Sequence, residues 1–212
     1  RRQRQMCIRD SYCTDDLGAG LRVLPLSKAL SKAYIQHNHP GMVWTLAFDM
    51  DREIIDPTDF WPVWDLAKLP PPNAAIQAIR TGRGHLLYFL AAGVCTTSAA
   101  RLKPMEYLAA IERAYTIALG ADPGYAKLIT KNPYNTRWRV WEIHGTLYTL
   151  DELASYVDLT VTGRQNGATD GRRNGATEKC RNRGLERGQD WAIFAPFATG
   201  FLGVSGRGRG AR

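Results

Sequence analysis

The clearest hydrophobic pattern in the chain is the alternation of MVWTLAFDMD, residues 42–51. Its large apolar residues fall on one face, and Asp49 and Asp51 end the opposite face. Because side chains two residues apart project from the same side of a strand, this pattern predicts a β-strand. The apolar runs 74–79 and 84–91 surround the turn RTGRG and predict an antiparallel hairpin.

Three segments carry helix signals. Pro104 begins a run with apolar residues at spacings of three and four, and Gly120 supplies its stop. The segment 149–152 is a capping box that predicts a helix over about 150–158, and 27–38 predicts a short helix running into a loop. The apolar residues of the longest helix are Met105, Leu108, Ile111, Tyr115 and Ala118.

Interleaved strands and helices predict a single α+β domain over residues 12–162, with further strands at 126–130 and 137–143. Residues 1–11 form a disordered basic arm in this interpretation. Residues 163–212 hold the near-repeat GRQNGATD–GRRNGATE and a Gly/Arg-rich end. Such a composition buries little surface, so we expect a flexible basic tail.

Charge and cysteine content narrow the class of protein. Of the net charge of +8, most comes from residues 163–212, which hold ten Lys or Arg and four Asp or Glu. This favours a polyanionic partner. No apolar run reaches the roughly 20 residues of a membrane-spanning helix, so we expect a soluble, non-secreted protein. The cysteines lack paired spacing and predict free thiols in a reducing compartment; they are Cys7, Cys13, Cys95 and Cys180.

Asp49 and Asp51 project together about 6.5–7 Å apart if they lie on a strand. Two converging carboxylates repel each other, and a divalent cation with a preference for hard oxygen ligands, Mg²⁺ or Mn²⁺, relieves that repulsion. The alternative is a strand that ends at the surface with both side chains solvated. The D-x-D pattern alone does not separate the two interpretations.

Other polar residues follow in a suggestive order. His85 begins an apolar strand just after Arg83, which is either a capped strand end or a catalytic arrangement. Asp122 follows the long helix in ADPG, where an ordinary turn is the simpler interpretation. Lys131 and Asn132 in ITKNPYNTRWR, with two arginines after them, form either a phosphate-binding segment or a basic loop.

His37 and His39 in QHNHP form a His-x-His pair that resembles the metal-binding pair of single-strand nicking endonucleases. Those enzymes have a hydrophobic residue between the histidines and a tyrosine nucleophile. Here Asn38 lies between them and Pro40 follows, which favours a turn.

Six segments together resemble the Replicase family of plasmid replication initiators, of the type found on colicin plasmids, within the archaeo-eukaryotic primase superfamily. The resemblance covers about residues 12–160, and the stretch from Val94 to Pro133 is its most specific part. The segments are YCTDDLGAGLRVLP, YIQHN, FDMDR, GHLLYFL, VCTTSAARLKPMEYLAAIERAYTIALGADPGYAKLITKNP and WEIHGTLYTLDELASYVDL.

The resemblance implies a primase-polymerase sheet like that of an RNA-recognition motif, with flanking helices and a D-x-D pair, a histidine and a third acidic residue. By this resemblance Asp49, Asp51 and Asp122 hold Mg²⁺ or Mn²⁺, with Glu142 as the alternative third acid. His85 is catalytic. The nucleotide-binding residues that it implies are Arg83, His85, Lys131 and Asn132.

The implied function is a plasmid replication initiator in the bacterial cytoplasm that makes a short primer from nucleoside triphosphates on single-stranded DNA at an origin. A host DNA polymerase is a further candidate partner. Family members continue into a DNA-binding region, whereas this chain has its NGAT repeats there. The alternatives are a His-x-His nicking endonuclease for rolling-circle initiation and a non-catalytic DNA-binding remnant.

Overall fold

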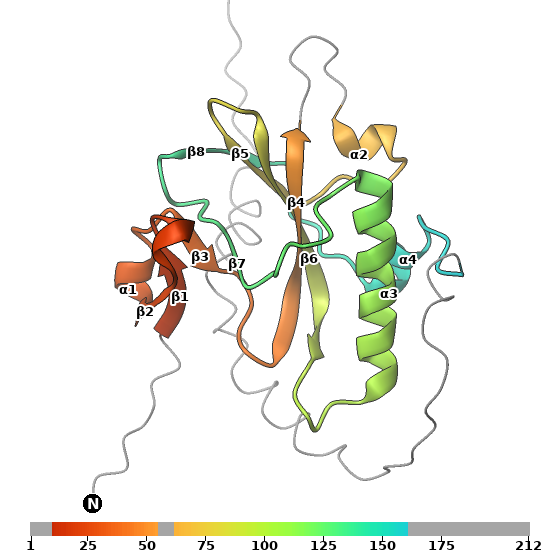
Figure 1. The fold of residues 1–212 in the computed structure, drawn as a ribbon. Helices are drawn as coiled ribbons and strands as arrows, with labels where there is room; N and C mark the ends of the chain where they lie inside the picture. Colours follow the sequence, from red (N-terminus) through yellow and green to blue (C-terminus); the bar gives the residue numbers. More distant parts are fainter. Residues whose placement is uncertain (1–9, 55–61, 161–212) are drawn as a thin grey trace, which may run out of the picture.

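The computed structural model describes residues 10–54 and 62–160 (Figure 1). Along the chain, the elements are β1 (Asp10–Thr14), a 3₁₀ helix η1 (Leu17–Ala19), β2 (Arg22–Pro25), α1 (Leu26–Ala29), β3 (Tyr34–Gln36), β4 (Met42–Glu53), α2 (Val63–Leu66), β5 (Ala74–Ala78), β6 (Arg83–Cys95), α3 (Leu102–Leu119), β7 (Ile129–Lys131), β8 (Trp138–Glu142) and α4 (Leu150–Ala154). Among these, no helix is both long and apolar enough to span a bilayer.

A central antiparallel sheet of four strands, in the order β4-β6-β5-β8, forms the middle of the molecule. The alternation predicted for 42–51 is confirmed, because Leu46 and Phe48 face the core under α3 while Ala47 faces the opposite side. The predicted hairpin is also confirmed as β5 and β6. β4 is therefore an edge strand of this sheet and pairs with β6 alone among the described strands of this sheet.

The helix α3 packs against one face of the central sheet. It begins at Leu102 and ends at Leu119, and the left-handed backbone of Gly120 (φ 60°) just after it provides the predicted stop. Tyr115 of α3 stacks on Phe48, and its ring lies edge-on to Tyr88 at 5.4 Å between centroids. Each such aromatic side chain stabilises the fold by about 1.5–3 kcal/mol through burial. This packing fixes β4 against the helix.

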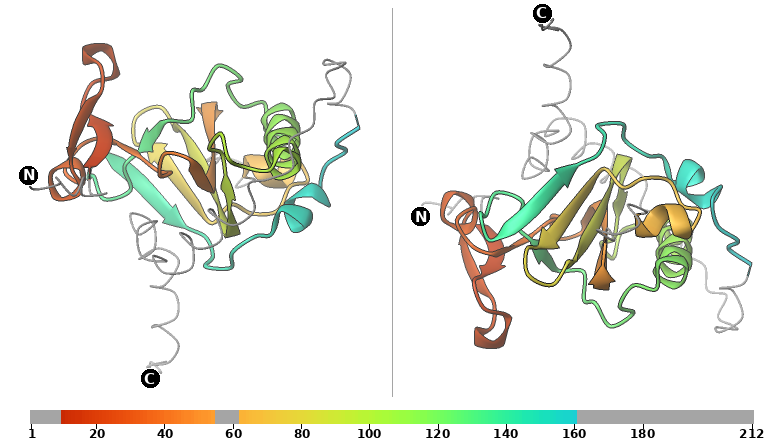
Figure 2. Two further views of the ribbon diagram at one scale, coloured as in Figure 1. Left: turned by 90° about the horizontal axis from the view of Figure 1, so that it is seen from below. Right: turned by 90° about the horizontal axis from the view of Figure 1, so that it is seen from above.

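A second sheet, in the order β2-β1-β3-β7, lies on the face of the central sheet opposite α3 (Figures 1 and 2). The two sheets meet through an apolar cluster that includes Ala33, Ala47, Leu87 and Trp138. Trp138 Nε1 donates to the carbonyl oxygen of Ala33 at 2.7 Å and so joins the layers directly. The chain thus has three layers: the N-terminal sheet, the central sheet and the helices.

Three expectations need correction. The short helix predicted in 27–38 is confirmed as α1, but residues 34–36 of the predicted loop form β3, because Ile35 is buried in the second sheet. β1 begins at Asp10, so the last two residues of the predicted arm belong to a strand. The capping box of α4 is confirmed, but the helix ends at Ala154. The predicted tail, 163–212, lies outside the described residues.

Two of the cysteines predicted as free thiols lie in the described part of the chain. Cys13 is buried in the second sheet, and Cys95 Sγ lies 3.3 Å from Thr97 Oγ1. Neither forms a disulfide there. Cys7 and Cys180 lie outside the described residues.

Candidate active site

The candidate site is built on the paired strands β4 and β6, on the face that the second sheet partly covers. Asp49 of β4 lies directly opposite His85 of β6 in the pairing register. His85 Nε2 lies 3.1 Å from Asp49 Oδ1. The imidazole is nearly inaccessible, with 4% of its side chain exposed, whereas 28% of the Asp49 side chain is exposed. The carboxylate therefore has one side held by a buried ring and another side open to solvent.

The hydrogen bonds of His85 fix its tautomer. The backbone N–H of Lys131 donates to His85 Nδ1 at 3.1 Å, and the Thr130 hydroxyl contacts the same nitrogen. Because Nδ1 accepts, the ring proton lies on Nε2 and is donated to Asp49. Burial lowers the pKa of His85, although Asp49 opposes this shift. His85 is therefore a neutral donor at pH 7.

Lys131 supplies the positive charge of the site. Its Nζ lies 3.7 Å from Asp49 Oδ1 and 5.7 Å from the centroid of the Trp138 ring. Burial lowers the pKa of Lys131, and the charges of Asp49 and Asp51 oppose that shift. Partial burial raises the pKa of Asp49, but His85 and Lys131 outweigh it, so that the pKa lies below its ordinary value. Asp49 is thus ionised at neutral pH.

Asp51 lies in an irregular part of β4, because the pairing with β6 shifts register just after Met50. Its side chain is 75% exposed, and its Oδ1 lies 3.9 Å from Arg83 Nη1. An exposed pair at this distance contributes little stability. Since the charge of Asp51 acts on Lys131, both carboxylates of the D-x-D pair lie near the same cation. The structure therefore brings together five of the predicted residues: Asp49, Asp51, Arg83, His85 and Lys131.

Asp122 contacts the edge of β4 at Asp49, and it does so with its backbone and not its side chain. Its N–H donates to the carbonyl oxygen of Asp49 at 2.9 Å. The Asp122 side chain instead accepts from the N–H of Gly124 at 2.8 Å, which closes a turn. Within the described part of the chain, no three His, Cys, Asp or Glu side chains form a group that could hold a metal ion.

Glu142, the alternative third acid, lies on β8 at the opposite edge of the central sheet. Three strand spacings separate β8 from β4, or about 14 Å. The side chain is exposed. Of the two acidic residues, Asp122 is the one beside Asp49.

Asn132 has a structural role. Its side-chain amide donates to the carbonyl oxygens of Leu30 and Lys32 at 2.8 and 2.7 Å, and its Oδ1 accepts from the N–H of Tyr134 at 3.0 Å. Both amide hydrogens are therefore used within the protein. The predicted contact of Asn132 with nucleotide is not favoured by this geometry, which instead holds the end of β7 in place.

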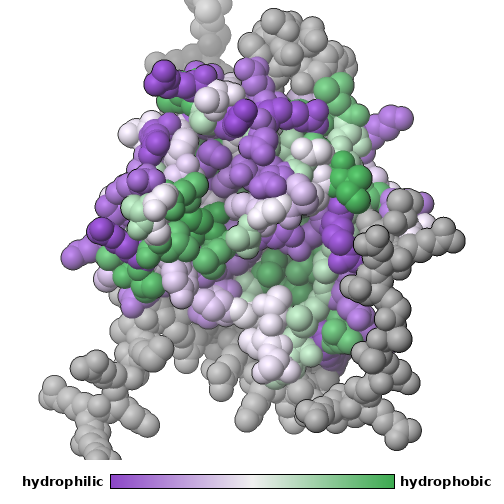
Figure 3. Space-filling model, in the orientation of Figure 1, coloured by the Kyte–Doolittle hydropathy of each residue, from purple (hydrophilic) through white to green (hydrophobic). Residues whose placement is uncertain are grey.

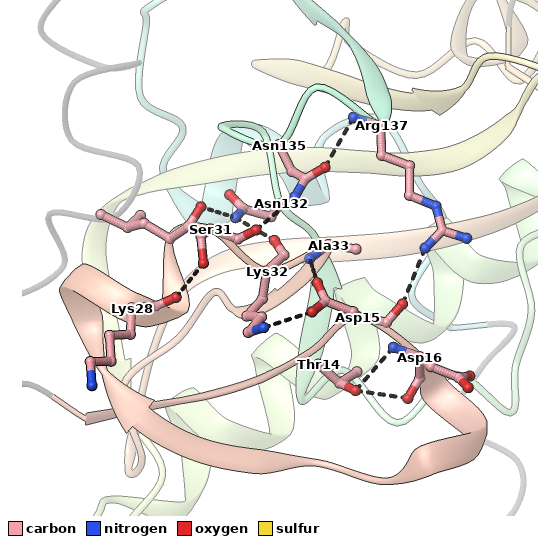
Figure 4. A network of polar contacts seen from close by, with 11 residues as sticks. Thr14, Asp15, Asp16, Lys28, Ser31, Lys32, Ala33, Asn132, Asn135 and Arg137 are labelled. Atoms are coloured by element: carbon pink, nitrogen blue, oxygen red, sulfur yellow. Dashed lines mark hydrogen bonds and ion pairs between the residues drawn. The ribbon is translucent and has the colours of Figure 1, made fainter.

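A polar network extends this anchoring, as Figure 4 shows. Arg137 Nη1 donates to the carbonyl oxygen of Asp15 at 3.1 Å, and Asn135 Nδ2 donates to that of Ser31 at 2.9 Å. The Asp15 carboxylate in turn accepts from Lys32 Nζ at 2.7 Å. These bonds tie the segment after β7 to the N-terminal sheet. They position the Thr130–Lys131 backbone against His85.

The His-x-His pair has a different placement. His37 is buried at the end of β3, whereas His39 is exposed. Between them, Asn38 Oδ1 accepts from the N–H groups of Trp44 and Thr45, both at 2.9 Å. Asn38 therefore caps the edge of β4, as a turn residue does. No tyrosine is among the described residues that line the cavity beside this pair.

Two residues of the site, Thr130 and Tyr125, were not predicted as site residues from the sequence. Thr130 contacts His85 Nδ1, and only its place beside Lys131 marked it. The ring of Tyr125 lies 5.1 Å from that of His85, and its hydroxyl donates to the carbonyl oxygen of Ile129. Tyr125 lies in the segment that links α3 to β7, and Thr130 lies in β7 itself, so only the folded chain places them at the histidine.

The donor set fits a hard divalent cation. Asp49 and Asp51 offer carboxylate oxygens, and 28% and 75% of their side chains are exposed, so an ion can reach them. Lys131 lies beside Asp49 and Arg83 beside Asp51, and these cations offset the negative charges of the two carboxylates. Asp122 becomes a further ligand only if its side chain leaves the turn at Gly124.

Comparisons with known proteins agree with this architecture. The structure is similar to the AEP domain of the cyanophage S-2L primase-polymerase (PrimPol), with a TM-score of 0.51 and 11% sequence identity over 71% of this chain and 88% of that domain. The fold is therefore that of a primase-polymerase AEP domain. The model of the Replicase family matches residues 6–157, and the chain belongs to this family. No curated protein matches it. The family model thus connects the chain to replication, and the structural likeness shows a primase-polymerase fold.

Proposed function

We propose that this protein is a primase that initiates replication by metal-dependent nucleotidyl transfer on a DNA template. The observation that carries the proposal is the pairing of buried, neutral His85 with Asp49, beside Lys131 and Asp51, on the edge strand of the central sheet. Such a group of carboxylates and cations suits phosphoryl transfer, in which catalysis depends on positioning and charge stabilisation.

Asp49 and Asp51 would hold Mg²⁺ or Mn²⁺, and Asp122 is the proposed third ligand. When bound, the ions would stabilise the attacking and leaving oxygens of an in-line displacement at the α-phosphate. The experiment that tests this assignment is removal of divalent ions, which we expect to abolish synthesis and which added Mn²⁺ or Mg²⁺ should restore.

The protein's own residues supply binding and orientation. Lys131 is a desolvated cation, so its attraction for a triphosphate is stronger than that of an exposed lysine. Arg83, more exposed, would contact the outer phosphates. The Nε2–H of His85 is the donor that faces the site and is offered to Asp49 or to a phosphate oxygen.

The finer setting is part of the same proposal. We infer a bacterial cytoplasmic protein that acts at a plasmid origin on single-stranded template, with nucleoside triphosphates as substrates and a host DNA polymerase extending its primer. Membership in the Replicase family supports the link to replication.

A primer-synthesis assay on the full chain, with single-stranded DNA, the four nucleoside triphosphates and Mg²⁺ or Mn²⁺, tests the function. We expect labelled primers from the wild type and none from Asp49→Ala or Asp51→Ala variants that keep their circular-dichroism spectra. Undiminished synthesis in both variants would refute the site. Strand cleavage with a covalent tyrosyl–DNA adduct would indicate a nicking endonuclease instead. Salt-sensitive DNA binding without turnover would indicate a binding remnant.

A further inference from the structure

A cavity of about 380 Å³ lies along the edge of β4, beside the catalytic face. It lies between the segment after β3, the edge of β4, α3 and the segment before β7. Figure 3 shows hydrophobic surface in the hollow beside α3, below the hydrophilic surface around the end of β4. The lining residues that matter here are His37, Thr45, Ala47, Leu108, Glu112 and Lys127.

His37 is the unusual residue of this cavity. Only 6% of it is exposed, and neither ring nitrogen has a hydrogen-bond partner within the described part of the chain. Burial, with smaller contributions from His85 and Lys127, lowers its pKa to about 3. The ring is therefore neutral at pH 7 and presents one unused donor and one unused acceptor. A buried polar group without partners is costly, and a ligand that supplies them removes the cost.

The charge of the cavity indicates which part of a ligand it takes. Lys127, the cation in its wall, is paired with Glu112 at 2.8 Å, and 17% of the Glu112 side chain is exposed. This pair leaves no net positive charge to hold a phosphate. Leu108 contributes apolar surface from α3. The cavity therefore suits an uncharged group that is partly apolar and that carries both donors and acceptors.

The position of the cavity connects it to the phosphate-binding cations. Ala47 lines it and lies two residues before Asp49 on the same face of β4, about 6.5–7 Å along the strand. His37 is also close enough to His85 for the two rings to interact electrostatically. A molecule with phosphates at Lys131 and His85 therefore has its uncharged end within reach of His37. The volume lies in the range of small-ligand sites.

We propose that this cavity binds the nucleoside of the incoming nucleotide and that His37 hydrogen-bonds its base or sugar. This inference rests on the proposed function and adds to it a specificity-determining residue outside the D-x-D, histidine and lysine group. A phosphate-only ligand makes no use of the cavity.

Equilibrium binding to the full chain separates the two proposals. The probes are an α,β-imido analogue of each nucleoside triphosphate and inorganic tripolyphosphate, both with Mg²⁺. In the variant His37→Phe, which keeps a planar aromatic ring but no polar ring atoms, we expect binding of at least one analogue to weaken about tenfold. Tripolyphosphate binding should stay unchanged. The variant His37→Gln, which keeps a donor and an acceptor, should recover part of the affinity and carries the test if His37→Phe does not fold.

Three outcomes contradict these claims, and they can be told apart. If the wild type binds the analogues and both His37 variants bind them equally well, the nucleoside cavity is refuted while the proposed function stands. If the wild type binds neither analogue nor tripolyphosphate, the proposed function fails and this inference with it. Equal weakening of analogue and tripolyphosphate in His37→Phe would place His37 in a general structural role and overturn the assignment.

Discussion

His85 and Asp49 face each other across the β4–β6 pair, with Nε2 3.1 Å from Oδ1. The bond has a fixed direction because the backbone of Lys131 donates to the other ring nitrogen. A buried neutral imidazole therefore orients a carboxylate that is itself open to solvent. The site depends on β7, a strand of the second sheet, as much as on the central sheet.

Thr130 is predicted to be a positioning residue through its contact with His85 Nδ1. Thr130→Val keeps the shape but removes the hydroxyl, so the histidine is oriented less firmly. We expect kcat for primer synthesis to fall about tenfold, with little change in KM. Thr130→Ser should restore most of the rate, whereas a purely steric role would leave Thr130→Val active and Thr130→Ser impaired.

Lys131 is predicted to bind the triphosphate. Lys131→Met removes the charge at 3.7 Å from Asp49 while keeping most of the chain length. A charge-assisted hydrogen bond is worth roughly 1.5–3 kcal/mol, so KM for nucleotide should rise about tenfold or more. Steady-state kinetics over a range of nucleotide concentrations measure this. A KM equal to that of the wild type would mean that Lys131 only balances the carboxylates.

The capping box of α4 allows a stability prediction away from the site. Thr149 Oγ1 accepts from the N–H of Glu152 at 3.1 Å, and the Glu152 carboxylate accepts from the N–H of Thr149 at 2.7 Å. Thr149→Ala should lower the free energy of unfolding by about 1 kcal/mol, as urea denaturation can measure. Nucleotide binding should not change. Thr149→Ser keeps the hydroxyl and should unfold at nearly the urea concentration of the wild type.

His37 makes stability depend on pH. Unfolded, it takes up a proton near pH 6.5, whereas folded it stays neutral down to about pH 3. Between these values the unfolded state binds more protons, so stability falls as pH falls. From pH 7 to pH 5 this costs about 2 kcal/mol. Urea denaturation of wild type and His37→Phe at both pH values should show a smaller loss in the variant. Equal losses would contradict a buried neutral His37.

The long periodic elements were predictable because their patterns are local. Met42 to Asp51 alternates over ten residues of β4, and the apolar spacing of α3 together with Gly120 specifies a helix and its end. The second sheet was not predictable from the sequence, because β3 and β7 have three residues each and pair across more than ninety positions of sequence. In 27–38 the Ala, Leu and Lys residues favour a helix, but burial of Ile35 between strands outweighs that propensity.

The site residues also differ in whether the sequence alone could locate them. Asp49 and His85 could be located from strand ends and from the resemblance to a family. The side-chain bonds of Asn132 depend on Leu30 and Lys32, about a hundred residues earlier, so its structural role is visible only in the folded chain. The sequence favoured a turn for the segment of His37 and His39 but did not show that His37 is buried and His39 exposed.

The central claim is that Asp49 is part of a nucleotidyl-transfer site. Metal-dependent primer synthesis by the full chain should be compared with two variants that each replace a carboxylate by its amide, Asp49→Asn in the site and Glu106→Gln on the exposed surface of α3. We predict a loss of at least about 100-fold for Asp49→Asn and wild-type synthesis for Glu106→Gln. Wild-type synthesis by a folded Asp49→Asn protein would contradict the account.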